Sequence, residues 1–503
     1  MADLSLAAEF PAATKEDWLA AVDSVLKGAS FDTVMRTPLA DGFVIEPLYE
    51  RAHGRLPIPG RAPGERWRII QRVDHPEPDA ANALALADLD GGADGLSIVF
   101  AGAAGARGYG IAAETLASLG RALDGVVLDI ITVRLDAGRR TRAAAALISA
   151  LAERRGLDRS RCRIAFGYDP LGILAVRGRL SAPWPRFEER ITDLVDGLSA
   201  EGFAGPFLTM DGRPYHEAGA SRATELAVML ATLVAYLRAL DAGGVPLERT
   251  PPMIDAVLTA DTDVFMTVAA IRALRLLWAR LLELCGIEHA PLAVHAEQSW
   301  RGMARQDPWT NMLRGTVAAF AAGVGGADSV TVLPFNAGLG LPDSFGRRVA
   351  RNAQHVLMAE AGLHRLDDPA AGAGAFEALT DELAEQAWRR FQAIEAGGGL
   401  PAALQNGHVQ SLIAADRAAT APRTLVGVTR FQDPDQAPVA VLEPGPPALS
   451  ARTRPPVADR FVAMVAAAAD GASLGDLSPL SEPDGVRAPP LEPAETSAQG
   501  ERR

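Results

Sequence analysis

The chain has 503 residues, 48% of them apolar and 22% charged, which is ordinary for a globular protein with one large domain and appendages or with two to three smaller domains. Its formal net charge is −13, and it contains no long basic run, so we expect no nucleic-acid partner. The two cysteines, Cys162 and Cys285, allow neither a zinc site nor a disulfide framework, and no uncharged apolar run is long enough for a membrane span, so we expect a cytoplasmic protein.

The first 50 residues are predicted to form an arm. Apolar residues recur at helical spacing from Lys15 to Leu26, and Gly28 ends this predicted helix. The N-terminus lacks the basic region and hydrophobic core of a signal peptide. Because the helix has one apolar face, we expect it to bury that face on its own domain or on a partner, as a subunit interface.

From residue 66 onward, short β-branched runs alternate with long stretches rich in alanine and leucine. Eight runs are predicted strands, at 66–73, 96–100, 126–132, 161–166, 205–210, 263–269, 291–296 and 328–334. Apolar strands that alternate with helices are typical of parallel strands buried on both faces. Eight such units predict an α/β fold with a (β/α)8 barrel at 51–400, and a doubly wound open sheet is the alternative.

The helices between and after these strands are marked by their ends and periodicity. Ser221 is a predicted N-cap for a helix with an apolar face from Leu226 to Leu237, and a second apolar face runs from 271 to 281. Helices are also predicted at 347–361 and at 374–396, where three glycines follow.

The C-terminal part differs in composition. Residues 401–480 are predicted to form a helical extension and linker, with an alanine-rich helix near 458–470. Residues 481–503 are poor in apolar residues and rich in proline, glutamate and serine, so we expect a disordered tail.

Ligands of such a barrel meet the loops at the C-terminal ends of its strands. These loops carry Arg107 and Tyr109 after the second strand, His216 and Glu217 after the fifth, and His295, Glu297 and Asn336 after the seventh and eighth. Each has an ordinary structural alternative, such as helix capping for His216 or a structural hydrogen bond for His295. The spacing shows no metal cluster, carboxylate pair or Ser/His/Asp set, so no metal site is predicted.

A set of spaced motifs extends from the seventh predicted strand to residue 369. They are H-x-x-x-S at 295–299, Q-D-P at 306–308, N-x-x-R at 311–314, G-L-P at 340–342, A-R-N-x-Q at 350–354 and D-P at 368–369. Together with R-G-Y at 107–109 and E-A-G at 217–219, they resemble the barrel of the methylmalonyl-CoA mutase family. The resemblance covers about residues 35–480.

The resemblance implies adenosylcobalamin chemistry on a CoA thioester. Members of this family rearrange the thioester by a radical reaction inside the barrel, and the corrin lies between the barrel and a C-terminal α/β domain. That domain supplies a histidine to cobalt from a D-x-H-x-x-G motif. The motif does not occur in this sequence, so we expect no cobalamin-binding domain in this chain and no cofactor bound by it alone.

Several positions depart from the catalytic members of the family. Arg72, Pro214, Leu333 and Ala337 stand where those members carry a tyrosine, a carbonyl-binding histidine, an asparagine and a cofactor-facing glutamate. We therefore expect these four positions to be degenerate, and we assign no catalytic residue. The expected vestigial substrate- or cofactor-facing residues are Arg107, Tyr109, Arg177, His216, Glu217, His295 and Glu297.

This pattern resembles the small (β) subunit of heterodimeric bacterial methylmalonyl-CoA mutases. The resemblance implies a non-catalytic chain that supports a large catalytic subunit, which interconverts methylmalonyl-CoA and succinyl-CoA. Adenosylcobalamin is then expected on the partner subunit and the CoA thioester in the complex. One alternative is an active acyl-CoA mutase barrel that works with a separate cobalamin-binding chain, and another is a CoA-ester-binding scaffold without a mutase partner.

Overall fold

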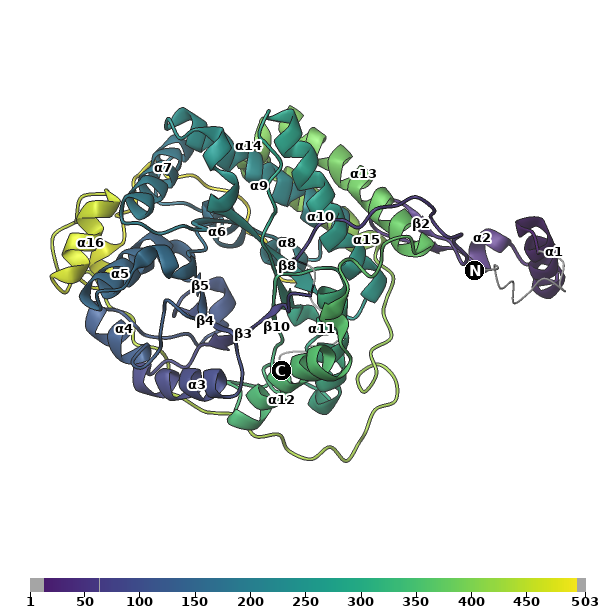
Figure 1. Cartoon of the computed structure of the whole chain (residues 1–503), viewed down its shortest axis with the longest axis horizontal. Coiled ribbons are helices and arrows are strands. Elements are labelled where there is room, and N and C mark those ends of the chain that lie inside the picture. The colour runs from purple at the N-terminus through teal and green to yellow at the C-terminus, as the bar shows by residue number, and fades with distance from the viewer. Residues whose placement is uncertain (1–12, 63, 495–503) are drawn as a thin grey trace, which may run out of the picture.

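Eight parallel strands form the centre of the molecule, and helices surround them (Figure 1). The computed structural model describes residues 13–62 and 64–494. The barrel strands are β3 (Arg68–Val73), β4 (Gly95–Val99), β5 (Thr132–Asp136), β6 (Arg163–Ala165), β7 (Leu208–Asp211), β8 (Ile254–Ala260), β9 (Val294–Gln298) and β10 (Ser329–Thr331).

The sheet closes on itself. The strands are neighbours in the order β6-β5-β4-β3-β10-β9-β8-β7, and the two ends of this row meet through a parallel bridge between Tyr168 and Leu208. The amide of Phe166 also donates to the carbonyl of Pro206 across this junction, at 2.9 Å. Closure removes both sheet edges. The predicted (β/α)8 barrel is therefore confirmed, and the doubly wound alternative is wrong.

Two of the eight predicted strands are misplaced. The strand predicted at 126–132 lies at Thr132–Asp136, where outward-packed Val133 and Leu135 alternate with residues of the barrel interior such as Arg134. The charged inner face hid the strand from a search for continuous apolar runs. The run at 263–269 is instead the start of α10, because the carboxylate of Asp263 accepts from the amide of Met266 and caps the helix. The strand of that unit is β8.

Helices cover the outside of the barrel, except the short α8 (Arg213–Glu217), which lies at its mouth. The covering helices are α3 (Pro78–Asp90), α4 (Leu116–Ala122), α5 (Thr141–Arg154), α6 (Pro170–Arg177), α7 (Trp184–Ala200), α9 (Arg222–Ala242), α10 (Val264–Leu284), α11 (Asn311–Val324), α12 (Ser344–His355), α13 (Gly374–Ala396), α14 (Gly399–Gln405) and α15 (His408–Ala419). Ser221 caps α9 as predicted, since its side chain accepts from the amide of Thr224. The helix predicted at 374–396 is confirmed as α13.

One described helix, α9, is long and apolar enough by composition to cross a membrane. Of its most apolar window, 89% is buried inside the protein. The helix packs along α13 and α7 in the outer layer of the barrel (Figure 1). Its apolar character is therefore explained by packing within the fold.

The N-terminal arm extends away from the barrel (Figure 1). Its helix α1 (Lys15–Leu26) has the predicted bounds, and α2 (Phe31–Val34) and the hairpin of β1 (Thr37–Pro38) and β2 (Val44–Ile45) follow. No residue of α1 is buried, and the side chain of Val25 is 76% exposed. The apolar face of the arm is thus uncovered in the isolated chain.

The C-terminal segment folds back over the barrel. After α16 (Phe461–Ala469) and α17 (Leu474–Leu477), residues 486–488 pair with the end of α6, where Arg179 and Arg487 form an antiparallel bridge. The amide of Leu491 donates to the carbonyl of Ala175, and Leu491 is buried. Residues 481–494 therefore differ from the predicted disordered tail, because their few apolar residues are used in packing. Residues 495–503 of the predicted tail lie outside the described residues.

Candidate functional site at the barrel mouth

A cavity of about 210 Å³ lies inside the barrel, toward the C-terminal ends of the strands. Asp136 at the end of β5, Asp211 at the end of β7 and Glu297 near the end of β9 face it, together with Arg213 at the start of α8. Leu491 and Pro493 of the C-terminal segment also line it. The cavity is therefore an ionic chamber at the position where ligands of such barrels bind.

Arg213 is the centre of an ion network in this cavity. Its guanidinium lies 2.8 Å from Asp211, 3.2 Å from Glu297 and 3.4 Å from Asp136. Arg72 on β3 adds a second cation, 3.6 Å from Glu297 and 3.4 Å from Asp74. Four strands and one helix thus contribute to a single set of paired charges.

Burial and ion pairing have opposite effects on the pKa values of the network residues. Burial alone favours the neutral form of Glu297, but Arg213, Arg72 and Arg107 outweigh it and hold the pKa of this carboxyl below its usual range. Burial likewise disfavours the charged form of Arg213, yet Asp211, Glu297 and Asp136 raise its pKa well above the ordinary value. The network consequently contains an ionised Glu297–Arg213 pair at neutral pH.

A third cation, Arg107, lies at the mouth of the cavity. Arg107 lies 2.8 Å from the carboxylate of Glu217, and its guanidinium carbon stands 4.2 Å above the ring of Trp300. Arg107 adopts a left-handed backbone conformation, with φ of 47°. Tyr109, predicted beside it, is half-buried and does not line the cavity.

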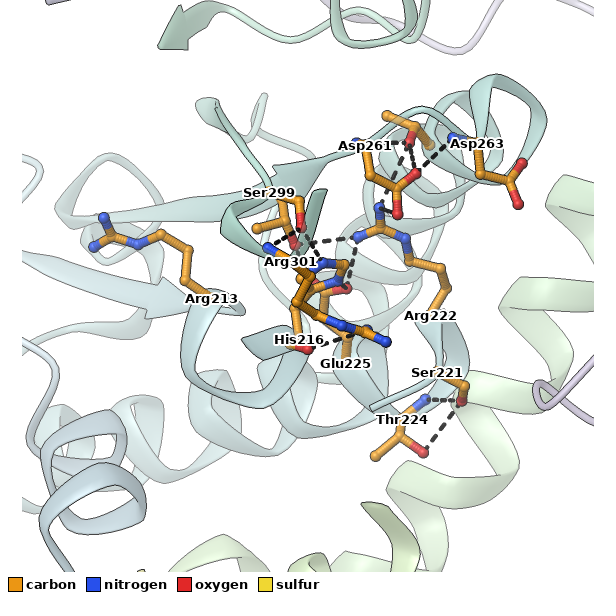
Figure 2. Close-up of polar contacts among 12 residues, drawn as sticks. Arg213, His216, Ser221, Arg222, Thr224, Glu225, Asp261, Asp263, Ser299 and Arg301 are labelled. Carbon is orange, nitrogen blue, oxygen red and sulfur yellow. Dashed lines mark hydrogen bonds and ion pairs between the residues drawn. The ribbon is translucent and has the colours of Figure 1, made fainter. Parts of the chain in front are cut away.

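His216 belongs to a separate buried network (Figure 2). Its Nε2 atom lies 2.7 Å from the hydroxyl of Ser299, and its Nδ1 atom lies 3.6 Å from Glu225. Glu225 is also paired with Arg222 at 2.8 Å. Although burial raises the pKa of Glu225, Arg222 and His216 keep it below its usual range. Ser299, His216 and Glu225 are all buried, so this serine–histidine–glutamate chain has no open access to a substrate.

His295 lines the cavity but uses both ring nitrogens in hydrogen bonds. Its Nδ1 atom lies 2.8 Å from the hydroxyl of Ser329, and its Nε2 atom lies 3.3 Å from that of Thr331. Burial, followed by the charges of Arg134 and Arg213, lowers the pKa of His295 well below its ordinary value. It is therefore a neutral, anchored side chain, as in the structural alternative for this residue.

The remaining predicted positions are dispersed. Pro214 lines the cavity, and Arg177 lies at its edge, where its guanidinium donates to the carbonyl of Gly102 at 2.5 Å. Leu333 is buried outside the cavity, and Ala337 is half-buried in the turn after β10. The structure thus brings Arg107, Arg177, Pro214, Glu217, His295 and Glu297 around one cavity and leaves out Tyr109, His216, Leu333 and Ala337.

The most connected residue of the site, Arg213, was not among the predicted ones. Neither were its partners Asp136 and Asp211, nor the pair of Arg134 and Asp255, which meet at 2.7 Å across the barrel. One signal was available, because the alternation in Thr132–Asp136 places charges on the inner face of a strand. Ion pairs between side chains on different strands leave no pattern among neighbouring residues of the sequence.

A cobalt ligand is not evident among these residues. The described residues contain no group of three or more His, Cys, Asp or Glu side chains suited to a metal ion. Two histidines are buried. His216 faces Ser299 and Glu225. His295 faces the hydroxyls of Ser329 and Thr331 on β10. Both histidines are enclosed by the fold, with side chains that are almost fully buried.

The chain is similar to known proteins over most of its length. A family model described as methylmalonyl-CoA mutase matches residues 54–459. A methylmalonyl-CoA mutase small subunit of Streptomyces virginiae is 41% identical over 88% of this chain and 74% of its own length. A small subunit of Propionibacterium freudenreichii subsp. shermanii is 34% identical over 84% of this chain and 68% of its own length.

A probable small subunit of Mycobacterium tuberculosis is 40% identical over 75% of this chain, and the match spans 62% of that relative. The large subunit of Streptomyces virginiae is 29% identical over 79% of this chain. The chain thus spans between 62% and 74% of the length of these small subunits. It resembles large and small subunits alike, with higher identity to the small ones.

Proposed function

Because the chain belongs to the methylmalonyl-CoA mutase family, we propose that it is the small, non-catalytic subunit of a heterodimeric methylmalonyl-CoA mutase. This enzyme is an isomerase that interconverts methylmalonyl-CoA and succinyl-CoA, and in our proposal the large subunit carries out the reaction. The observation that supports the non-catalytic role is the ion network around Arg213, which lines the barrel cavity with mutually paired charges.

The network argues against substrate chemistry in two ways. A reactive site holds hydrogen-bond donors and charges oriented toward the substrate, whereas Arg213, Asp211 and Glu297 are oriented toward one another. Leaving one member of a buried pair without a partner costs about 3–5 kcal/mol. In addition, the cavity of about 210 Å³ is smaller than the roughly 300–1,000 Å³ of typical pockets for drug-sized ligands. A CoA thioester is larger still.

The family uses adenosylcobalamin, and we propose that the partner subunit binds it. Both buried histidines of this chain are engaged with hydroxyl or carboxylate neighbours, so neither is available to cobalt without rearrangement. The positions Arg72, Pro214, Leu333 and Ala337 remain predicted losses of substrate and cofactor contacts. Arg107, Tyr109, Arg177, His216, Glu217, His295 and Glu297 remain proposed vestiges of the catalytic barrel.

The arm is the proposed subunit interface. The side chains of Leu19 and Val25 in α1 are 38% and 76% exposed, and that of Val34 in α2 is 56% exposed. No residue of α1 is buried. A projecting element with an uncovered apolar face is typical of association surfaces. We accordingly propose residues 1–50 as the interface arm, 51–400 as the barrel and 401–480 as an extension and linker.

The test is reconstitution. The chain is purified alone and together with a large mutase subunit, and succinyl-CoA formation from methylmalonyl-CoA is measured with added adenosylcobalamin. We expect no turnover by the chain alone and turnover by the complex. After the complex is dissociated and the subunits are separated, we expect the cobalamin absorbance in the fraction that contains the large subunit. Turnover by this chain alone, or with a separate small cobalamin-binding protein, would instead establish an active barrel.

A further inference from the structure

A second pocket, of about 300 Å³, lies outside the barrel cavity and is unusually rich in arginine. It is bounded by the start of α5, the end of α6, α7 and residues 478–481. Five arginines line it, although the chain as a whole carries a net charge of −13. They are Arg139, Arg142, Arg177, Arg179 and Arg190.

Two of these arginines are neutralised by carboxylates. Arg142 and Arg190 both pair with Asp459, the latter at 2.7 Å, and Arg142 also pairs with Asp193. Arg190 additionally lies 3.8 Å from Glu482. These pairs hold the segment before α16 against α5 and α7, so their role is structural.

The other three arginines have no carboxylate within ion-pair distance among the described residues. We call Arg139, Arg177 and Arg179 the arginine triad. Burial, followed by the neighbouring charges of Arg140, Arg177 and Arg179, lowers the pKa of Arg139. The triad is therefore a concentration of like charges that the protein itself leaves uncompensated.

The backbone around the triad is held firmly. The amide of Leu180 donates to the carbonyl of Val486 at 2.9 Å, and the amide of Ala488 donates to that of Gly178 at 2.8 Å. The side chain of Arg177 is fixed by its bond to the carbonyl of Gly102. The guanidinium of Arg177 therefore loses little conformational entropy when it binds an anion, whereas the exposed side chains of Arg139 and Arg179 are ordered by the ligand.

The remaining walls combine three serines, Ser181, Ser478 and Ser481, with apolar side chains. Tyr168 and Phe187 are buried side chains that line the pocket, and Ile173 lies between it and the barrel cavity, which it also lines. Arg139 and Arg177 likewise face both spaces. The pocket thus combines cationic groups at one side with a surface for the organic part of a ligand.

From this arrangement we propose that the arginine triad binds the phosphate groups of an organic phosphate that carries a pyrophosphate or several phosphate charges. Guanidinium groups bind phosphate oxygens through paired, charge-assisted hydrogen bonds, and three of them match two adjacent phosphates. The ligand can be a free nucleotide or the nucleotide end of CoA, since both carry a pyrophosphate. This proposal is independent of the proposed subunit role.

The proposal is tested by isothermal titration calorimetry on the folded chain at low, constant ionic strength. The probes are inorganic pyrophosphate, ADP and CoA. The double variant Arg139→Gln/Arg179→Gln is compared with the control Arg249→Gln, an exposed arginine without a carboxylate partner among the described residues, on the segment before β8 at the opposite end of the barrel. Circular dichroism melting verifies that each variant is folded.

We expect all three probes to bind and the double variant to weaken each of them by about a hundredfold, or about tenfold per arginine. The control should change binding by less than about twofold, because its charge lies far from the pocket. Stronger binding of CoA than of ADP would identify CoA as the source of the phosphates, and stronger binding of ADP would identify a nucleotide. Absence of binding by all three probes, or binding that the double variant leaves unchanged, would overturn the proposal.

Discussion

Replacing Arg213 by methionine tests whether the barrel is held by its ion network. The variant removes the cation from three carboxylates whose side chains are between 3% and 15% exposed. Breaking a buried pair by removing one partner costs about 3–5 kcal/mol. Because Glu297 keeps Arg72 at 3.6 Å, we expect the lower end, a loss of about 3 kcal/mol in the free energy of unfolding at pH 7.5.

The pH dependence of this loss is diagnostic. In the native protein the pKa of Glu297 is lowered, so its contribution to stability is complete above the unfolded value of 4.5 and declines as the pH falls through the folded value. Without Arg213, its nearest cation, the buried carboxyl keeps only Arg72 and Arg107, and its folded pKa rises. The difference between native and variant should therefore be largest near pH 8 and shrink toward pH 5.

Urea denaturation followed by tryptophan fluorescence at pH 5, 6.5 and 8 measures this difference. The matched control is Arg121→Met, which breaks an exposed pair with Asp79 at 3.2 Å and should cost no more than about 1 kcal/mol. The further variant Arg213→Met/Glu297→Gln should recover part of the loss. A loss equal to that of the control, or one that does not vary with pH, would refute a stabilising role for the network.

Three further changes have defined outcomes. Burial, followed by the charge of Asp211, raises the pKa of Asp169 to about 7, so native stability should fall as the pH rises from 4 to 7, and Asp169→Asn should flatten that slope in urea titrations. Ser329→Ala removes the partner of a buried ring nitrogen and should cost about 1–3 kcal/mol in the same assay; no loss would argue against an anchoring role. Val25→Glu should weaken association with a large mutase subunit in sedimentation velocity, whereas Leu56→Glu, equally exposed but outside the arm helix, should not.

Local signals predicted much of the fold. The helix from Lys15 to Leu26, the cap at Ser221 and the end of α13 before its glycines all depend on residues within a few positions of each other, and all three were located correctly. The alternation of strands and helices predicted the barrel, because each unit repeats the same short pattern. Strand β5 was missed where that pattern is inverted, with Arg134 and Asp136 on the inner face.

The sequence by itself determined the family and the barrel class, since motifs and periodicity are readable without contacts. It proposed eleven site positions, and the structure places six of them around the cavity. Only the tertiary structure decided that Arg213 connects β5, β7 and β9, that His216 faces Ser299, and that residues 481–494 cover the barrel. The physical reason is that ion pairing and burial depend on distances between residues far apart in the chain. The type of a charged residue does not show whether its side chain is exposed or buried. That depends on how the strands assemble when the barrel closes.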